Sequence, residues 1–411
     1  MSSARQTPRF HMMAKPVSYR CNIKCEYCFY LEKEDMMDVK NDDTVMSDKV
    51  LKQYVQDYIN SHKDYDSIDF AWQGGEPTLA GLDFFKQAVH YQKLFGKGKT
   101  ITNSFQTNAI AINKQWAEFF AENNFLIGVS IDGTAEIHDR YRVSVNNKPT
   151  FERVKKAIDL LKEYKVEFNT LTVINAENWN KGKEVYHALK NLGSEYLQFI
   201  PIVELGSSCQ QIKDGKYAPD ANPELAPFSV PSHGYGKFMT DVFNEWVCND
   251  IGKVYVRIFD SILSCWVGLP ASVCVQSKIC GNAMIVESNG DIYSCDHYVY
   301  PANMLGNIAE TNIKKIALSK KQRNFGVAKN TMLTEACKSC EVHSLCYGGC
   351  PKHRIMSIEG EHHMHNYLCS SYKDIFKHTA PAMHQMSEAL KRGGTAADVM
   401  PFMAQIYKSK D

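Results

Sequence analysis

The sequence has no long hydrophobic run and almost no net charge. Its 411 residues contain no apolar stretch long enough for a transmembrane helix, and the residues before Phe10 lack the apolar core of a signal peptide. Lys and Arg number 47 against 46 Asp and Glu, so the net charge of +1 offers no basis for binding nucleic acid or an anionic membrane surface. We therefore expect a cytoplasmic protein with no nucleic-acid or membrane partner.

Cysteine, by contrast, is abundant, with 14 residues in the chain. Disulfides are rare in the cytosol, and a chain of this length can bury a large core without them. The cysteines are therefore expected to be metal ligands, reactive thiols or small buried residues. The content of 44% hydrophobic and 23% charged residues is that of a globular protein, and the length predicts two or three domains.

Short apolar runs alternate with amphipathic stretches through the first half of the chain, which predicts an α/β fold with a parallel sheet. Six strand–helix units suit an open, partial (β/α)6 TIM-like barrel better than a closed barrel of eight. The predicted strands are Phe10–Pro16, Ile68–Trp72, Ile101–Gln106, Phe125–Ile131, Phe168–Ile174 and Tyr196–Val203. The predicted helices are 48–60, 82–94, 113–122, 151–164, 179–192 and 235–248. Ligand sites in such sheets lie at the carboxyl ends of the strands.

The composition changes after the last of these strands. Residues 206–231 contain four prolines and little periodicity, which predicts a long functional loop or a linker. Beyond Cys274, short strands, turns and cysteines predict a small domain organised around metal. The predicted division is 1–231 for the partial barrel, 232–273 for connecting helices, 274–375 for the small domain and 376–411 for a C-terminal helical tail.

Cys21, Cys25 and Cys28 form the pattern CxxxCxxC directly after the first predicted strand. Three thiolates on one short loop can hold three irons of a cubane cluster and leave the fourth open to a small molecule, whereas zinc takes four protein ligands or three plus water. After the next strand, Gly74 and Gly75 permit close backbone approach, and Glu76 can accept a hydrogen bond from an ammonium group.

Together these two motifs resemble the radical S-adenosylmethionine superfamily, whose cysteine motif carries an aromatic residue at the position of Tyr27. The resemblance implies a 4Fe–4S cluster whose open iron binds the methionyl amino and carboxyl groups of S-adenosylmethionine. One electron from that cluster then releases L-methionine and a 5′-deoxyadenosyl radical. Gly74, Gly75 and Glu76, with Pro77, are similar to the family's GGEP motif, which contacts the methionyl amine.

Eight cysteines in the second half are enough for two four-thiolate sites, and their spacing alone fits zinc and iron–sulfur equally. The run resembles the SPASM domain, which implies two auxiliary 4Fe–4S clusters and three clusters in all. The resemblance assigns Cys274, Cys280, Cys295 and Cys350 to one auxiliary cluster, and Cys337, Cys340, Cys346 and Cys369 to the other. Cys209, Cys248 and Cys265 stay unassigned and are expected to be small buried or half-buried residues.

Most of the chain, to about Tyr372, is similar to the anaerobic sulfatase-maturating enzymes. The segments that carry this resemblance include Lys15-Pro16, Cys28-Phe29-Tyr30, Phe105-Gln106-Thr107-Asn108, Ser130-Ile131-Asp132-Gly133, Cys295-Asp296-His297 and Leu305-Gly306-Asn307-Ile308. The resemblance implies oxidation of a Cys or Ser in an unfolded sulfatase peptide, at a Cys/Ser-x-Pro/Ala-x-Arg motif, to Cα-formylglycine. It also implies an electron donor such as flavodoxin or ferredoxin.

Individual roles follow from the same resemblance. Tyr30, Gly75, Ser130, Arg142 and Val203 match positions that bind S-adenosylmethionine, and Asp296 matches the proton acceptor. Other polar residues near these motifs are expected to be structural. His138 and His297 are expected to be hydrogen-bonding residues outside the site. Lys352, His353 and Arg354 look like a solvated basic segment, with a substrate-facing edge as the alternative.

Two alternative functions are left open by the sequence. One is another SPASM-type enzyme that modifies peptides by forming a thioether or a carbon–carbon crosslink. Such enzymes often carry a domain that binds a peptide leader, and we expect none at the N-terminal end because little chain precedes Phe10. The other is a zinc or iron–sulfur scaffold with no enzymatic activity.

Overall fold

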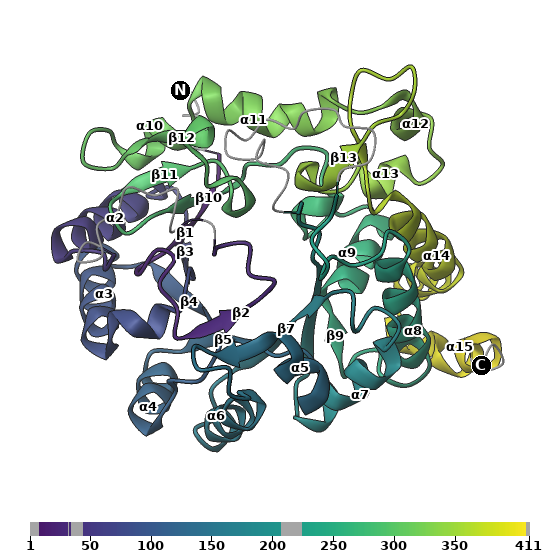
Figure 1. The fold of residues 1–411 in the computed structure, drawn as a ribbon, viewed down its shortest axis with the longest axis horizontal. Helices are drawn as coiled ribbons and strands as arrows, with labels where there is room; N and C mark the ends of the chain where they lie inside the picture. Colours follow the sequence, from purple (N-terminus) through teal and green to yellow (C-terminus); the bar gives the residue numbers. More distant parts are fainter. Residues whose placement is uncertain (1–7, 32, 34–43, 207–223, 408–411) are drawn as a thin grey trace.

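The structure, a computed structural model, describes residues 8–31, 33, 44–206 and 224–407. Its centre is a parallel sheet that curls into an open barrel with helices on the outer face (Figure 1). Six neighbouring strands follow one another in chain order: β1 (His11–Ala14), β3 (Ser67–Trp72), β4 (Thr100–Thr107), β5 (Phe125–Ser130), β7 (Phe168–Ile174) and β8 (Tyr196–Pro201). The predicted α/β fold and its six strands are confirmed.

The helices around the barrel begin at caps that the sequence predicts. Ser47 and Asn113 accept hydrogen bonds from the backbone N–H groups of Val50 and Trp116, as capping side chains do. The outer helices are α2 (Asp48–Ser61), α3 (Leu82–Phe95), α4 (Lys114–Glu122), α6 (Phe151–Glu163), α7 (Gly182–Asn191) and α8 (Gly234–Asn249). Helix α7 begins later than predicted because the Asn178 side chain instead bonds the backbone of Asn175 and Val173 in a turn.

The sheet continues past the six predicted strands on both sides. Strand β9 (Tyr255–Val256) pairs with β8, and β10 (Ala283–Val286) pairs parallel with β1. Antiparallel strands β11 (Asp291–Tyr293) and β12 (Met304–Asn307) complete that edge. The register sets Ala14 opposite both Trp72 and Val286, so β1, β3 and β10 end at one level. The sheet therefore runs across the boundary predicted at 274, and the domain limits stay predictions.

Two three-residue strands lie above the barrel and were not predicted. Strand β2 (Ile23–Cys25) lies inside the first cysteine loop, and β6 (Arg142–Ser144) follows the short helix α5 (Ala135–Tyr141). They pair antiparallel and set Cys25 directly opposite Arg142. This pairing holds the cysteine loop over the strand ends.

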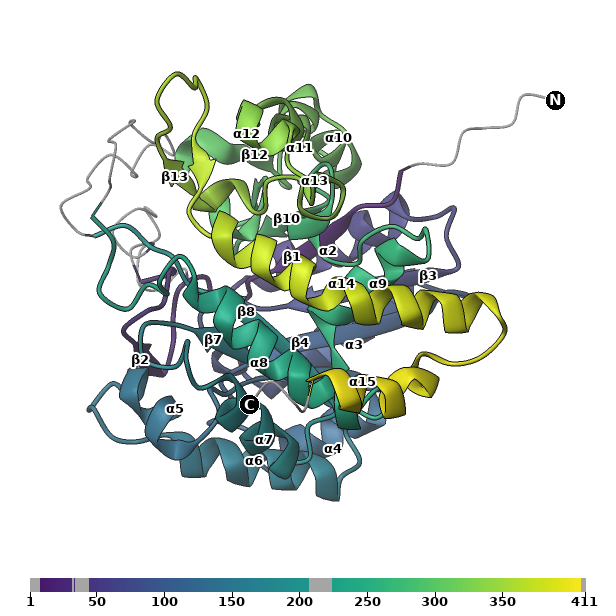
Figure 2. The same cartoon turned by 90° about the vertical axis from the view of Figure 1, so that its right-hand side faces the viewer.

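Short elements follow the barrel and connect the remaining cysteines. They are α9 (Arg257–Trp266), α10 (Ile313–Ala317), α11 (Lys320–Thr331), α12 (Glu335–Lys338), α13 (His343–Cys346), β13 (Arg354–Met356), β14 (His365–Asn366), α14 (Cys369–Lys391) and α15 (Met400–Tyr407). Figure 2 shows α14 running alongside α8, so one long helix ties the last cysteine to the barrel. It also crosses the boundary predicted at 376.

Part of the predicted loop at 206–231 is outside the described residues, which resume at 224. Its two described ends meet, because Leu205 and Leu225 form an isolated antiparallel bridge. No helix among the described residues is both long and apolar enough to cross a membrane.

Candidate active site

The first cysteine loop leaves β1 and lies over the carboxyl ends of the neighbouring strands. Burial, helped by the neighbouring Cys28 and Cys21 and opposed by the Arg142 charge, raises the pKa of the Cys25 thiol to about 12. Cys21 itself is exposed, and Asn108 at the end of β4 donates to its Sγ at 3.6 Å. The three thiols are therefore within electrostatic reach of one another, and the loop is anchored to the barrel.

The Gly74–Gly75 turn after β3 packs directly against this loop. A Cβ atom on Gly75 would lie 1.9 Å from the carbonyl oxygen of Arg20, and φ at Gly75 is +22°. At Gly74, with φ of +100°, a Cβ atom would lie 2.7 Å from the Cβ of Lys15. Both positions thus require glycine, because any side chain would push the turn away from the residues that begin the cysteine loop.

Glu76 is fully buried and joins the ends of β3 and β4. Its Oε1 accepts from Thr78 N at 3.0 Å, Thr78 Oγ1 at 2.7 Å and Thr107 Oγ1 at 2.8 Å, and its Oε2 accepts from Asn108 N at 2.7 Å. Oε1 thus accepts from three donors and Oε2 from only one, although each carboxylate oxygen can accept at least two hydrogen bonds. Oε2 therefore keeps capacity for one more donor, which is consistent with the predicted contact to an ammonium group.

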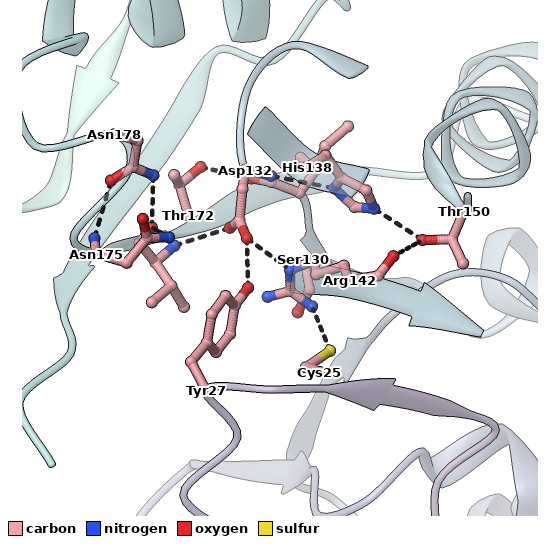
Figure 3. A network of polar contacts seen from close by, with 12 residues as sticks. Cys25, Tyr27, Ser130, Asp132, His138, Arg142, Thr150, Thr172, Asn175 and Asn178 are labelled. Carbon is pink, nitrogen blue, oxygen red and sulfur yellow. Dashed lines mark hydrogen bonds and ion pairs between the residues drawn. The ribbon is translucent and has the colours of Figure 1, made fainter. Parts of the chain in front are cut away.

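Figure 3 shows a buried polar network centred on Asp132, just beyond the end of β5. Its Oδ2 accepts from the Tyr27 hydroxyl and from Arg142 Nε at 3.0 Å, and its Oδ1 accepts from Val173 N at 2.9 Å. Arg142 Nη1 in turn lies 3.9 Å from Cys25 Sγ. Burial raises the pKa of Tyr27, so its hydroxyl stays a donor. One carboxylate thus holds both the aromatic residue of the cysteine motif and the cation that faces a cluster thiol.

His138 belongs to the same network as a neutral side chain, because burial lowers its pKa to about 4. Its Nδ1 accepts from Asp132 N at 3.3 Å, so its Nε2 carries the proton and donates to Thr150 Oγ1 at 3.0 Å. The Thr150 hydroxyl then donates to the Arg142 carbonyl at 2.5 Å. His138 thus forms hydrogen bonds, as expected, but it does so within the network of Asp132 and Arg142, and its purely structural role stays a prediction.

A second buried group forms where the two halves of the chain meet. Lys15, just after β1, places its Nζ 2.5 Å from Asp296 Oδ1 and 4.0 Å from the centre of the Tyr30 ring. The Tyr30 hydroxyl donates to Glu287, just after β10. The Lys15 side chain is 1% exposed and that of Asp296 is 20% exposed. Burial alone would raise the pKa of Asp296, but the charge and hydrogen bond of Lys15, together with His297 and the charge of Lys352, outweigh burial and the pKa is lowered.

The resemblance assigned the eight later cysteines to two sets, and their role as cluster ligands stays a prediction. The second set (Cys337, Cys340, Cys346 and Cys369) lines a single cavity. The first set (Cys274, Cys280, Cys295 and Cys350) is also close together. Burial, and then the neighbouring Cys350 and Cys274, raises the pKa of Cys295, and burial raises that of Cys280 to about 11.

The segment Lys352, His353 and Arg354 is not solvated, and that prediction was wrong. The three residues are 8%, 6% and 7% exposed. Lys352 forms an ion pair with Glu204 and lies 5.0 Å from the centre of the Phe29 ring. The chain turns inward directly after Cys350, so these charges face the cysteine sets and the barrel.

The remaining predicted site residues have ordinary surroundings. Ser130 accepts from Gln106 Nε2 at 3.0 Å, and Val203 is 3% exposed beyond β8.

Of the unassigned cysteines, Cys248 is buried and Cys265 is half-buried, while Cys209 lies outside the described residues. His297 Nδ1 is 3.6 Å from Cys350 Sγ. Burial lowers the pKa of His297 to about 4, so it is a neutral neighbour of the first set.

The sequence analysis gave no role to Lys15, Asp132 or Glu287. A polar residue directly after a predicted parallel strand was the signal that could have found Asp132, whereas Lys15 lay inside the predicted strand Phe10–Pro16, which ends at Ala14 in the structure. A cavity of about 700 Å³ at the opposite mouth of the barrel contains none of the predicted site residues. It is lined by the beginnings of the strands, including Leu126, Phe168, Tyr196 and Tyr255.

Comparisons with known proteins agree with this arrangement. Residues 16–189 match the Radical SAM superfamily, and residues 274–341 match SPASM, an iron-sulfur cluster-binding domain. A serine-type anaerobic sulfatase-maturating enzyme of Bacteroides thetaiotaomicron is 41% identical over 395 residues, which are 95% of this chain and 94% of the relative. A cysteine-type anaerobic sulfatase-maturating enzyme of Clostridium perfringens is 34% identical over 93% of this chain and 100% of its own.

Solved structures give the same result. The structure of native anSMEcpe with bound AdoMet and Cp18Cys peptide superposes with a TM-score of 0.80 at 34% identity, covering 93% of this chain and 100% of that one. Streptococcus suis SuiB bound to S-adenosylmethionine shares the fold, with a TM-score of 0.58 at 15% identity over 88% of this chain and 77% of that one. The chain belongs to the anaerobic sulfatase-maturating enzymes of the radical SAM superfamily.

Proposed function

We propose that this chain oxidises a Cys or Ser residue in an unfolded sulfatase polypeptide to Cα-formylglycine. The observation that carries the proposal is the Lys15–Asp296 ion pair, which joins the end of β1 to the loop of Cys295 and leaves the carboxylate partly exposed. The two relatives described above are of the serine and the cysteine type, so both residues are candidate targets.

The donor sets fit three 4Fe–4S clusters. Cys21, Cys25 and Cys28 would hold the cluster with an open iron, and the first and second sets would hold one fully ligated cluster each. Supporting this, four cysteines line one cavity, and no further protein ligand is needed there. Residues that would contact S-adenosylmethionine are Tyr30, Gly74, Gly75, Glu76, Ser130, Arg142 and Val203.

The positions of the thiols also weigh against zinc. Among the described residues, no three His, Cys, Asp or Glu side chains are grouped so as to hold one metal ion. A single zinc ion would draw its sulfurs to within about 3.8 Å of one another, because each Zn–S bond is about 2.3 Å. In a cubane each sulfur binds a different iron, so the four thiolates stay further apart.

When bound, S-adenosylmethionine and the clusters supply the hydrogen-atom abstraction and the electron transfer that no side chain can provide. The chain's own residues position the substrate, exclude water and move the proton. Asp296 accepts the proton of the substrate thiol or hydroxyl, and Lys15 keeps that carboxylate ionised until it does so. A positioned general base contributes about 10²–10⁴-fold to a rate.

The substrate peptide would enter in an extended form, at a Cys/Ser-x-Pro/Ala-x-Arg motif, and be held by backbone hydrogen bonds as well as side chains. A flavodoxin or ferredoxin would supply the electron to the first cluster. The cytoplasm is the compartment we propose, because no cysteine in the described part of the chain forms a disulfide, as expected in a reducing environment.

The test uses the anaerobically reconstituted chain with a Cys-x-Pro-x-Arg peptide and its Ser analogue. We expect a peptide aldehyde that reacts with a hydrazide, seen by mass spectrometry together with 5′-deoxyadenosine. A product that has lost two hydrogens without gaining an aldehyde would point to a crosslinking enzyme instead. Stoichiometric zinc without labile sulfide would leave only the scaffold function.

Asp296→Asn tests the proposed proton acceptor separately. The amide keeps the size of the side chain but cannot act as the base, so we expect aldehyde formation to fall by about 10²-fold or more. Reductive cleavage of S-adenosylmethionine should continue, because that cofactor belongs to the first cysteine loop. Aldehyde formation at the native rate would remove Asp296 from the mechanism.

A further inference from the structure

Two buried cations lie against the auxiliary cysteine sets, and neither forms an ion pair with a carboxylate of the described residues. Lys329 on α11 is 1% exposed, and Arg354 at the start of β13 is 7% exposed. The buried Lys15, Arg142 and Lys352, in contrast, each pair with an Asp or Glu. A buried charge is costly unless a counter-charge lies close to it. An anion other than a carboxylate beside both residues would supply that counter-charge.

Lys329 is fixed against the loop that carries two members of the first set. Its Nζ donates to the carbonyl oxygens of Cys274 at 2.7 Å, Val275 at 3.0 Å and Ser277. Three acceptors need three N–H groups, so the amine is a protonated ammonium. The helix is pressed onto the same loop, since a Cβ atom on Gly326 would lie 2.4 Å from the Cys280 carbonyl oxygen.

Arg354 is fixed between the two sets. Its guanidinium donates to the carbonyl oxygens of Gly348 at 3.3 Å, Met332 at 3.2 Å and Tyr347 at 3.2 Å. Tyr347 and Gly348 lie in the short link from Cys346, a member of the second set, to Cys350, a member of the first. Burial lowers the pKa of Arg354, whereas Cys337 and Cys350, one thiol from each set, act to raise it.

We propose that Lys329 and Arg354 are the counter-charges of the auxiliary clusters and set their reduction potentials, Lys329 for the first set and Arg354 for both. This inference rests on the proposed function, because it takes clusters to occupy the two sets. A cluster with four thiolates is an anion that becomes one charge more negative when it accepts an electron. A fixed positive charge beside it stabilises that reduced form, and it does so strongly where water is excluded.

The positive charges of Lys329 and Arg354 assist the step in which the substrate loses an electron. As the substrate's C–H and S–H (or O–H) bonds break and a C=S (or C=O) bond forms, it gives up one hydrogen atom, one proton and one electron. The hydrogen atom goes to the radical derived from S-adenosylmethionine, the proton to Asp296 and the electron to an auxiliary cluster. For a Cys substrate, water would then hydrolyse the C=S group to the aldehyde and release hydrogen sulfide. Lys329 and Arg354 are therefore positioning residues for the electron acceptor and do not touch the substrate.

The experiment is an anaerobic redox titration of the full chain, followed by electron paramagnetic resonance and compared at equal iron and sulfide content. Lys329→Met should shift the midpoint potential of one auxiliary cluster to a more negative value and leave the other unchanged. Arg354→Met should shift both to more negative values. Lys321→Met is the matched control, because Lys321 lies on the same helix but is exposed and donates to the Met304 carbonyl.

Lys329→Gln is the second variant if Lys329→Met fails to take up iron, because the amide keeps two N–H donors without the charge. It should also shift one potential to a more negative value. Unchanged potentials in the fully loaded variants would overturn the inference, and a shift of only one cluster in Arg354→Met would overturn the shared role of Arg354. A wild-type chain that takes up no auxiliary clusters would overturn the proposed function itself.

Discussion

The Lys15 ammonium lies 2.5 Å from the Asp296 carboxylate, although the two residues are far apart in the sequence. The sheet explains how they meet: β1 and β10 are parallel neighbours, and Ala14 pairs with Val286. Because β1 and β10 end at the same level of the sheet, Lys15, which follows β1, lies beside the cysteine-rich segment that follows β10. The extension of the barrel sheet by the cysteine-rich region is therefore what assembles this pair.

We predict that Lys15→Met lowers aldehyde formation by roughly tenfold or more, because an uncompensated buried carboxylate is disfavoured in its charged form. Cleavage of S-adenosylmethionine should be affected much less. The pKa of Asp296 is lowered in the native protein, so the base stays ionised as the pH falls through the acid range. In the variant, burial is opposed only by Lys352 and His297, so the pKa of Asp296 rises and the acid limb of the pH–rate profile should move to higher pH.

Lys15→Arg keeps the charge and is the control for that prediction. It should retain more of the aldehyde-forming activity than Lys15→Met and should show a smaller displacement of the acid limb. The ion pair would have no part in the reaction if Lys15→Met gave the native profile at full iron content.

Gly75→Ala should disrupt the first cysteine loop, because the new Cβ atom would lie 1.9 Å from the Arg20 carbonyl oxygen. Backbone must move to relieve such a contact, and the alanine also carries strain of about 1–2 kcal/mol in a left-handed conformation. Gly98→Ala is the control for backbone strain without the steric clash, since Gly98 has φ of +79° and nothing lies within 4 Å of the added Cβ atom. We expect S-adenosylmethionine binding, measured by calorimetry, to be lost in Gly75→Ala and kept in Gly98→Ala.

The barrel could be predicted closely because its signals are local. Strand β7 has the predicted limits, and α2 and α4 follow their predicted caps, since apolar periodicity and capping act within a few residues. The pairing of Cys25 with Arg142 could not be predicted, because β2 and β6 are three residues long and carry no periodicity. The burial of Arg354 was missed for a similar reason: only tertiary packing turns that segment inward.

The pH dependence of stability should carry a contribution from Asp260 on α9. Burial raises the pKa of its carboxyl from 3.8 to about 6. Between these values the folded chain binds more protons than the unfolded chain, so this residue makes stability fall as the pH rises toward 6. Asp260→Asn should therefore raise Tm above that of the wild type at pH 7, with a smaller difference at pH 5. Asp159→Asn, on the exposed face of α6, should change Tm equally little at both pH values.

Asp132→Asn tests whether the network in Figure 3 holds the first cysteine loop in its working position. The amide cannot serve as the charged acceptor for Tyr27 and Arg142 together, and breaking a buried ion pair costs about 3–5 kcal/mol. Arg142 would then lose its orientation toward Cys25. We expect a lower Tm and, at equal iron content, weaker binding of S-adenosylmethionine.

Asp250→Asn is a matched control for this loss of stability, because the chain repeats the same chemistry away from the cysteines. Asp250 is 7% exposed and accepts from the Tyr186 hydroxyl at 2.7 Å and Lys190 Nζ at 2.5 Å, between α7 and α8. This variant should also lower Tm but leave S-adenosylmethionine binding per loaded cluster unchanged. A role in positioning Arg142 and the cysteine loop predicts weaker cofactor binding in Asp132→Asn than in Asp250→Asn. Equal cofactor binding in the two variants would mean that Asp132 only stabilises the fold.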